Sequence, residues 1–174
     1  MNAFSDGVIA ILITILVLEL RPPHGHQLSD ILDEKGKLLA YVLSFVMVGI
    51  YWNNHHHLMQ IVTSIDGRTL WANMHLLFWL SLTPLTTDWL GTAGVETGPV
   101  AAYSIVLLGC AIAFSLMTLA LLALHESTSQ LAQAIGRDRK GKISLATYVL
   151  AVLFAFLEPW IAIGLVVAVA LIWF

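Results

Sequence analysis

Histidine residues are the side chains of this sequence with the most evident chemistry. Three of them are consecutive, at His55, His56 and His57, and His75 follows in the next apolar segment. Imidazoles bind metal ions, but consecutive residues on a helix point about 100° apart, so three adjacent histidines cannot converge on one ion. A membrane di-iron hydroxylase would need several histidine pairs spaced three or four residues apart. The pattern therefore argues against a metal centre.

Further polar side chains lie in the same apolar segments. They are Ser5, Asp6 and Thr14 in the first segment, Trp52, Asn53 and Asn54 beside the histidines, and Asn73 near His75. Polar groups within a bilayer are costly unless they are paired. We expect an interhelical hydrogen-bond network formed by His55, His56, His75, Asn54, Asn73 and Trp52, which also meets Ser5 and Asp6. By itself, Asp6 could also be a helix-start residue that follows an N-cap at Ser5.

Several function classes find no support in the sequence. It contains no nucleophile, base and orienting group in a recognisable pattern, and no glycine-rich phosphate loop. No enzyme activity and no cofactor are expected. The single cysteine, Cys110, lies in an apolar stretch and excludes an intramolecular disulfide. A net charge of -3 without a long basic tract gives no case for nucleic-acid binding.

The segments that carry these residues are expected to be membrane helices. Apolar residues make up 59% of the 174 positions, charged residues only 11%, and mean hydropathy is +0.85. A helix needs roughly 20 apolar residues to cross a bilayer. An all-α membrane protein is predicted, with a single domain over 1–174 and six helices at roughly 4–20, 38–61, 69–90, 99–124, 143–157 and 160–174. One kinked helix over 143–174 would be too long for one crossing. Pro84 is expected to kink the third helix.

Basic residues predict the orientation of these helices, because cytoplasmic loops are enriched in Lys and Arg. One set of connections contains Arg68, Arg137, Arg139, Lys140 and Lys142, and the opposite side contains Arg21, Lys35 and Lys37. The larger set is assigned to the cytoplasm. Both termini of a multi-pass protein of the cell membrane are then cytoplasmic.

The first segment has a periodic pattern of its own. Phe4, Gly7, Ile11, Thr14 and Leu18 recur at alternating spacings of three and four residues, which places them on one stripe of a helix. Such a stripe could line a pore or form a packing seam between helices. Spacing alone does not decide between these two interpretations.

Three motifs together resemble the transmembrane protein 175 family of potassium-permeable channels. They are F-S-D followed by G-V-x-A-I-x-x-T-I-L-V-L in the first segment, Tyr51-Trp52-x-x-His55-His56 in the second, and Asn73-x-His75 leading to Pro84 in the third. The match to a single six-helix repeat identifies the chain as similar to prokaryotic members. The resemblance implies a homotetramer in the lipid bilayer, in which the first helix of each chain lines a central pore for K⁺ and other monovalent cations.

The resemblance also implies roles for individual residues. Ile11 aligns with the isoleucine constriction of the family, with Ile15 and Leu18 as further apolar positions, and Thr14 aligns with the threonine layer linked to potassium preference. Phe4, Ser5 and Asp6 align with a signature motif that polar residues of the next two helices hold in place. The family usually has an Arg four residues before this Phe, and that position falls before Met1.

Two other functions remain open from the residues alone. A proton-coupled secondary transporter could use Asp6, His55 and His75, although no internal repeat typical of transporters is visible in the sequence. A non-conducting membrane scaffold is the third possibility. A potassium-permeable channel with a hydrophobic gate is the function that we expect.

Overall fold

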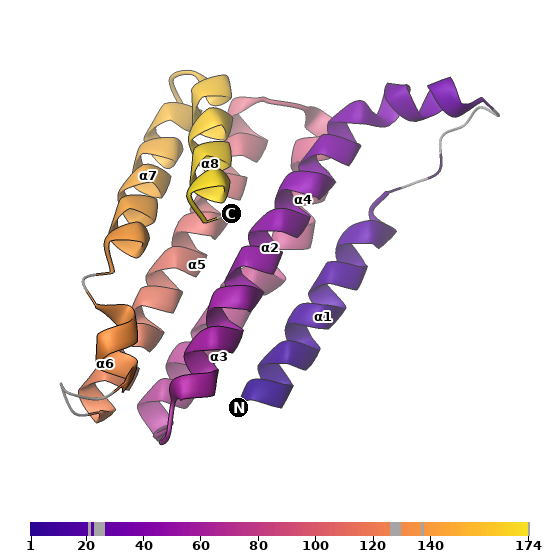
Figure 1. The fold of residues 1–174 in the computed structure, drawn as a ribbon. Coiled ribbons are helices and arrows are strands. Elements are labelled where there is room, and N and C mark those ends of the chain that lie inside the picture. Colours follow the sequence, from indigo (N-terminus) through magenta and orange to yellow (C-terminus); the bar gives the residue numbers. More distant parts are fainter. Residues whose placement is uncertain (21, 23–26, 126–129, 137, 174) are drawn as a thin grey trace.

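The protein consists of α-helices that lie side by side (Figure 1). A computed structural model of the chain describes residues 1–20, 22, 27–125, 130–136 and 138–173. Within these ranges it contains helices, turns and loops but no β-strand. The predicted all-α class is confirmed for this part of the chain. Arg21 and Arg137, two of the residues used to orient the chain, lie outside the described residues.

The helices follow one another with short connections. In chain order they are α1 (Asn2–Leu18), the 3₁₀ helix η1 (Leu28–Glu34), α2 (Lys35–Ile61), α3 (Gly67–Ser81), α4 (Thr83–Ala93), α5 (Thr97–Leu124), α6 (Gln130–Ile135), α7 (Arg139–Ala155) and α8 (Pro159–Trp173). Two of the differences from the expected ranges concern the third and fifth expected helices. The single helix expected over 69–90 is divided into α3 and α4, and the one expected over 143–157 begins at Arg139.

Two segments have the length and apolar composition of a membrane-spanning helix. They are Ile31–Ile61 and Thr97–Leu124. Asn2–Leu18 and Pro159–Trp173 are apolar helices of shorter length. The remaining helices are interrupted, shorter or more polar.

The start of α3 and its break are both explained by local chemistry. The carboxylate of Asp66 accepts hydrogen bonds from the backbone N–H of Thr69 (2.8 Å) and from its hydroxyl (2.7 Å). These bonds cap α3 and lower the pKa of the Asp66 carboxyl. At the other end Pro84 has no N–H and cannot continue the helix regularly, so α3 ends at Ser81 and α4 begins after Leu82.

Side-chain hydroxyls stabilise the break. Thr86 and Thr87 donate hydrogen bonds to the carbonyl of Thr83, at 3.2 and 2.7 Å. The N–H of Leu82 is directed to the carbonyl of Trp79, at 3.2 Å. These bonds add local contacts on both sides of the break, as side-chain hydroxyls do beside proline in membrane helices. The kink expected at Pro84 is confirmed.

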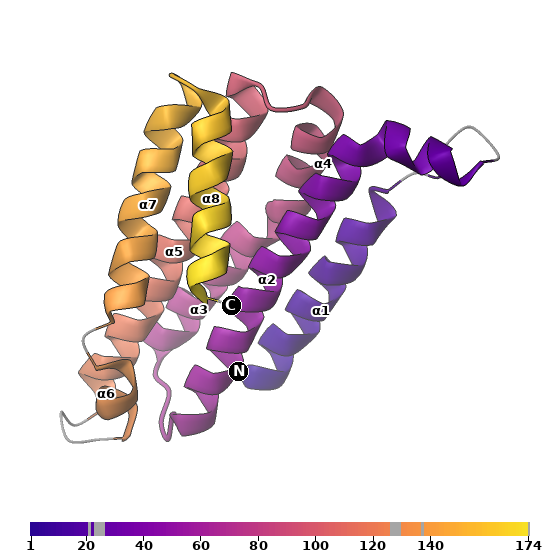
Figure 2. The ribbon, with the colours of Figure 1, turned by 45° about the horizontal axis from the view of Figure 1, so that its top comes forward.

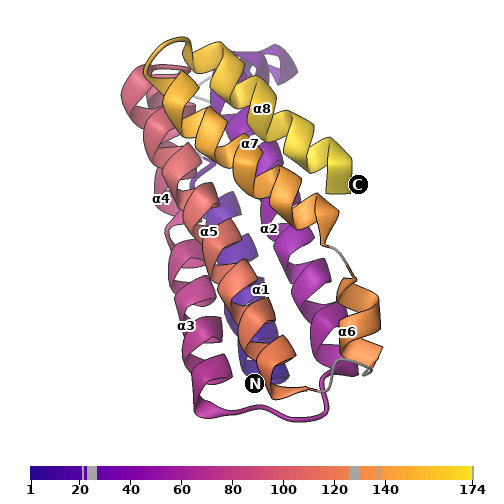
Figure 3. The same cartoon turned by 90° about the vertical axis from the view of Figure 1, so that its left-hand side faces the viewer.

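The arrangement of the helices places α1 at one side of the protein. In Figures 1 and 2, α1 lies against α2, and the α7–α8 hairpin lies on the opposite side of α2. The first turn of α1 lies beside the last turns of α2. Figure 3 shows α6 next to the same end of α2, below the end of α8. The first turn of α1 can therefore contact α2 and α3, which carry the predicted network.

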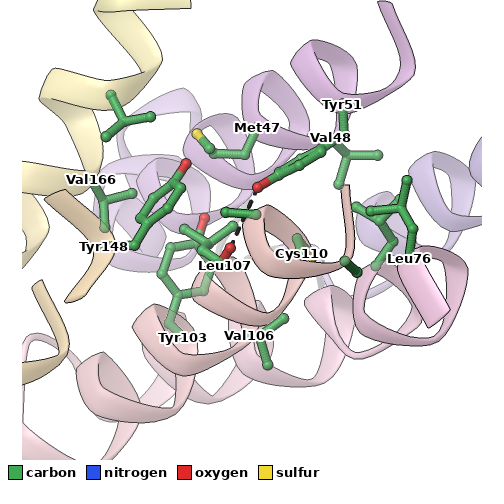
Figure 4. Packing of buried hydrophobic residues seen from close by; sticks show 14 of the residues in the cluster. Met47, Val48, Tyr51, Leu76, Tyr103, Val106, Leu107, Cys110, Tyr148 and Val166 are labelled. Atoms are coloured by element: carbon green, nitrogen blue, oxygen red, sulfur yellow. Dashed lines mark hydrogen bonds between the residues drawn. The ribbon is translucent and has the colours of Figure 1, made fainter. Parts of the chain in front are cut away.

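The core is centred on α5. Its buried side chains include Tyr103, Leu107 and Cys110, and they meet Met47 of α2 and Tyr148 of α7 (Figure 4). The hydroxyl of Tyr51 donates to the carbonyl of Leu107 at 3.4 Å. Cys110 is a buried free thiol. This packing fixes α5, and α2 and α3 are positioned against it.

One glycine of α5 is required by a close approach of α3. A Cβ atom on Gly109 would collide with the indole ring of Trp79. A Cβ atom on Gly164 of α8, by contrast, would meet nothing within 4 Å. Gly109 therefore lets the Trp79 ring lie against the backbone of α5, whereas no packing reason for glycine is found at Gly164.

We predict that Gly109→Ala destabilises the protein and Gly164→Ala does not. The added methyl group at Gly109 must displace a large ring, which costs about 1–3 kcal/mol in a packed core. Alanine at Gly164 fits open space and favours the helix. Thermal unfolding of the detergent-solubilised protein measures both effects. Equal unfolding temperatures for the two variants would contradict the close approach.

Candidate functional site

Helix α1 has two faces of different character. Ser5, Ile9, Leu12 and Leu16 are buried against the rest of the chain. The stripe predicted from the sequence lies on the other face. Ile11 is 60% exposed and Leu18 is 76% exposed, and Phe4, Gly7 and Thr14 are also exposed. An apolar helical face of this kind is left uncovered by its own chain.

Ile15 and Thr14, two further positions of the predicted pore, differ in their surroundings. Ile15 is half-buried, so it lies at the border between the two faces. The hydroxyl of Thr14 donates a hydrogen bond to the carbonyl of Ile11, at 2.7 Å. The proton of the hydroxyl is thus engaged within the helix, and the lone pairs of its oxygen are available on the exposed face.

A buried hydrogen-bond cluster joins three helices. The Asn73 side-chain amide of α3 donates to Ser5 Oγ of α1 at 2.9 Å, and Ser5 Oγ lies 3.2 Å from Asn73 Oδ1. His55 Nε2 of α2 lies 2.9 Å from the same Oδ1. All three residues are almost completely buried. Because the amide oxygen only accepts, His55 carries its proton on Nε2 when the amide has this orientation.

A second bridge joins α1 to α2 at a half-buried position. The indole N–H of Trp52 donates to Asp6 Oδ1 at 3.0 Å. His56 Nδ1 lies 3.8 Å from Asp6 Oδ2, which is too long for a hydrogen bond but allows charge attraction when His56 is protonated. The rings of Trp52 and His56 stack with their centroids 5.5 Å apart. Asp6 therefore has a tertiary role. The alternative of a helix-start residue after an N-cap at Ser5 is wrong, because α1 begins at Asn2 with Met1 as its N-cap residue and Asp6 lies beyond the first turn.

Gln60 is a further partner in this bridge that was not predicted from the sequence. Its side-chain amide lies 3.0 Å from His56 Nε2, one turn further along α2. An amide N–H can donate to this nitrogen, which leaves the proton of neutral His56 on Nδ1, the nitrogen that faces Asp6. The spacing of four residues between His56 and Gln60 was the signal available in the sequence.

Asn54 and His75 do not join the network that was predicted for them. The Asn54 amide donates to the carbonyl of Ile50 in its own helix, at 2.8 Å. His75 Nε2 accepts the indole N–H of Trp79 in α3, at 2.9 Å. Asn73 and His75 are two positions apart and point about 200° apart on the helix, so only one of them can face α1 and α2. The predicted network contains Asn73, but the prediction that it also contains Asn54 and His75 is wrong.

Metal binding has no geometric support in the described ranges of the chain. No group of three or more His, Cys, Asp or Glu side chains gathers there in an arrangement that could hold an ion. The buried histidine, His55, faces a neutral amide, and His56 faces a single carboxylate. These residues serve contacts between helices.

A separate buried cluster of hydroxyl groups was not foreseen. Thr87 Oγ1 of α4 lies 2.6 Å from Ser44 Oγ of α2, and Ser44 Oγ lies 3.0 Å from the hydroxyl of Tyr103 in α5. Because the proton of Thr87 is donated to the Thr83 carbonyl, Ser44 is the donor to Thr87. The three oxygens connect α2, α4 and α5 beside the break at Leu82. Serine and threonine occur so commonly in membrane helices that the sequence gives no signal for this particular set.

We predict that Asn73→Leu destabilises the protein far more than Asn54→Leu. Leucine at position 73 leaves Ser5 and His55 without partners, at about 1–3 kcal/mol for each buried group. Leucine at position 54 removes only a bond within one helix. Thermal unfolding in detergent measures the difference. Similar losses in both variants would contradict the central place of Asn73.

Comparison with known proteins gives a consistent result. The family model described as the endosomal/lysosomal potassium channel TMEM175 matches residues 1–84. A potassium channel of Chryseobacterium sp. (strain P1-3) is 48% identical over 173 residues, covering 99% of this chain and 90% of the relative. An endosomal/lysosomal proton channel TMEM175 of Bos taurus is 32% identical over 178 residues, covering 89% of this chain and 36% of that protein.

A solved structure is similar over almost the whole chain. It is the crystal structure of a lysosomal potassium-selective channel TMEM175 homolog from Chamaesiphon minutus, with a TM-score of 0.83 and 25% identity, covering 99% of this chain and 93% of the other. These relatives are ion channels of membranes and not enzymes, in agreement with the expectation from the sequence. The chain belongs to the TMEM175 family, as a prokaryotic member.

Proposed function

We propose that this chain forms a homotetrameric K⁺ channel in which the α1 helices of four copies line the pore. The observation that carries the proposal is the exposed stripe of α1, with Ile11 60% and Leu18 76% exposed while Ser5 faces the interior. One helix cannot surround an ion, so the wall of the pore must be built from the α1 helices of several copies. The number four follows the family resemblance.

The pore is proposed to be narrowed by Ile11, with Ile15 and Leu18 as further apolar positions. Four Ile11 side chains around one axis would form a ring from which water leaves readily. An ion would then have to lose hydration without replacement by polar groups, which is a large barrier. Ile11 is thus assigned to a hydrophobic gate that opens when the helices move apart.

Thr14 is proposed to favour K⁺ over Na⁺. Its hydroxyl proton is donated to the Ile11 carbonyl at 2.7 Å, so its oxygen can offer lone pairs to a partly dehydrated cation. Hydroxyl oxygens are weak ligands, and they suit K⁺ because it loses water more easily than Na⁺. Selectivity should be moderate, since no backbone carbonyl filter is supplied by this helix.

Six crossings of the membrane per chain are proposed. The α3 and α4 helices together would make one kinked crossing, and α6, with six residues, is too short for a crossing. The crossings are then α1, α2, α3–α4, α5, α7 and α8. An even number returns both termini to one side, and the basic residues Arg68, Arg139 and Lys140 assign that side to the cytoplasm of a cell membrane.

The Asp6–Trp52 and Ser5–Asn73–His55 contacts support this function by fixing the rotation of α1. The proton-coupled transporter is less well supported by the same contacts. It would require Asp6, His55 and His75 to act in sequence, whereas His75 bonds to Trp79 on an exposed part of α3. We therefore keep the channel as the single proposed function.

Ile11→Asn is expected to raise K⁺ flux. A polar ring retains water, and a reduction of the barrier by ~1.4 kcal/mol gives about a tenfold increase. The increase is measured as K⁺ efflux from liposomes that contain the purified protein. Ile112→Asn on α5, where the isoleucine is 41% exposed, is the matched control and should leave flux unchanged. Unchanged flux in Ile11→Asn would exclude Ile11 from the gate.

Thr14→Val is expected to lower the K⁺/Na⁺ permeability ratio toward one. Valine keeps the shape of threonine and removes the oxygen that would contact the cation. Reversal potentials under opposed K⁺ and Na⁺ gradients report the ratio. Thr118→Val on α5 removes a hydroxyl with a similar bond to its own helix, at 2.9 Å to Phe114, and serves as the control. A reversal potential that stays constant in Thr14→Val would remove Thr14 from the selectivity site.

A further inference from the structure

Three adjoining hollows form a crevice between α2, α5 and the α7–α8 hairpin. The first is lined in part by Met47, Tyr51, Phe114 and Tyr148. Asn54 and Trp173 line all three hollows, so the hollows adjoin one another along α2 and the end of α8. Helices α7 and α8 lie on the side of α2 that faces away from α1 (Figures 1 and 2), so the crevice that they border lies on that side.

We propose that this crevice binds a membrane phospholipid with a primary ammonium headgroup, the acyl chain lying along α2 and the ammonium group bound by the Asp138 carboxylate. This inference concerns a site separate from the pore, so it does not depend on the proposed roles of Ile11 or Thr14.

The walls of the crevice suit an acyl chain. Apolar side chains line each hollow. Phe45, Val46 and Ile50 line the second hollow, and Leu58 and Ile61 line the third. The backbone at Gly49 also lines the second hollow, where an added Cβ would meet nothing within 4 Å. An apolar, elongated space at the surface of a membrane protein is most readily filled by the hydrocarbon that surrounds it.

Among the described residues, Asp138 is the single Asp, Glu, Lys or Arg that lines this space, and His57 also borders the third hollow. Asp138 borders the first and third hollows, at the start of α7. Its Oδ1 accepts the N–H of Gly141 at 3.1 Å, which caps the helix. Among the described residues no cation lies within salt-bridge distance of this carboxylate. A carboxylate at the edge of an apolar space favours a cationic group with N–H donors, such as a primary ammonium.

The rim beside Asp138 is complementary to a phosphate. Lys140, two residues along α7, places its Nζ 3.0 Å from the carbonyl of Ile172 and 5.6 Å from the centroid of the Trp173 ring. The Trp173 indole donates to Ser144 at 2.8 Å, which holds it as a wall of the crevice. A zwitterionic headgroup could thus place its ammonium at Asp138 and its phosphate toward Lys140. A purely anionic headgroup would bring like charge to Asp138.

Native mass spectrometry of the detergent-purified full chain tests the proposal. It is titrated with phosphatidylethanolamine, phosphatidylglycerol and phosphatidylcholine of identical acyl chains. Asp138→Asn retains a side-chain acceptor for Gly141 and tolerates the positive φ of 39° at this position, but it removes the charge. Phosphatidylethanolamine should bind the wild type about tenfold more tightly than the other two lipids, and Asp138→Asn should abolish that preference.

A second variant tests the acyl-chain half of the site. Gly49→Leu fills the second hollow and should weaken retention of every lipid, whereas Gly164→Leu, on α8, adds the same side chain in other open space and should not. Equal retention of the three lipids by the wild type, or unchanged retention in both Asp138→Asn and Gly49→Leu, would overturn the proposal. Displacement of the lipid by soluble glycerophosphoethanolamine would identify a water-soluble amine instead and would also overturn it.

Discussion

The side-chain amide of Asn73 is the group on which the position of α1 depends. A buried amide in an apolar helix must find partners within the protein, because water is not available to satisfy it. Asn73 finds them in Ser5 of α1 and His55 of α2, at 2.9 Å in each case. These bonds are directional, unlike the apolar packing around them. They therefore determine the rotation of α1 about its own axis, which packing alone would fix less strictly.

The rotation decides which residues α1 exposes. Successive residues differ by about 100° around a helix, so holding Ser5 inward also turns Ile9, Leu12 and Leu16 inward. The stripe that includes Ile11 and Thr14 must then face away from the chain. A rotation by one residue would bury part of this stripe and expose the hydroxyl of Ser5. The half-buried Asp6–Trp52 bridge adds a second restraint at the same end of α1.

Much of this arrangement could be predicted from the sequence, because the signals are local. Long apolar runs predicted the helices, Pro84 predicted the kink, and the stripe of α1 followed from its spacing. Ser5, His55 and Asn73 stood out as polar residues in apolar segments. Asn54 and His75 stood out equally, yet they lie outside the network. Which of two neighbouring polar residues faces a partner depends on the packing of α3 against α5, where Gly109 admits the Trp79 ring, and that contact joins distant parts of the chain.

Helix α2 connects the two sides of the protein. On one side its Trp52 and His55 bond to α1 and α3, and on the other its Ile50 and Asn54 line the crevice beside α8. All four residues lie within two turns of one helix, and helices in packed proteins move largely as rigid bodies. A molecule that fills the crevice would limit the movement of α2 toward α8. It would thereby restrain the same helix that sets the rotation of α1, although it would contact neither α1 nor the exposed stripe.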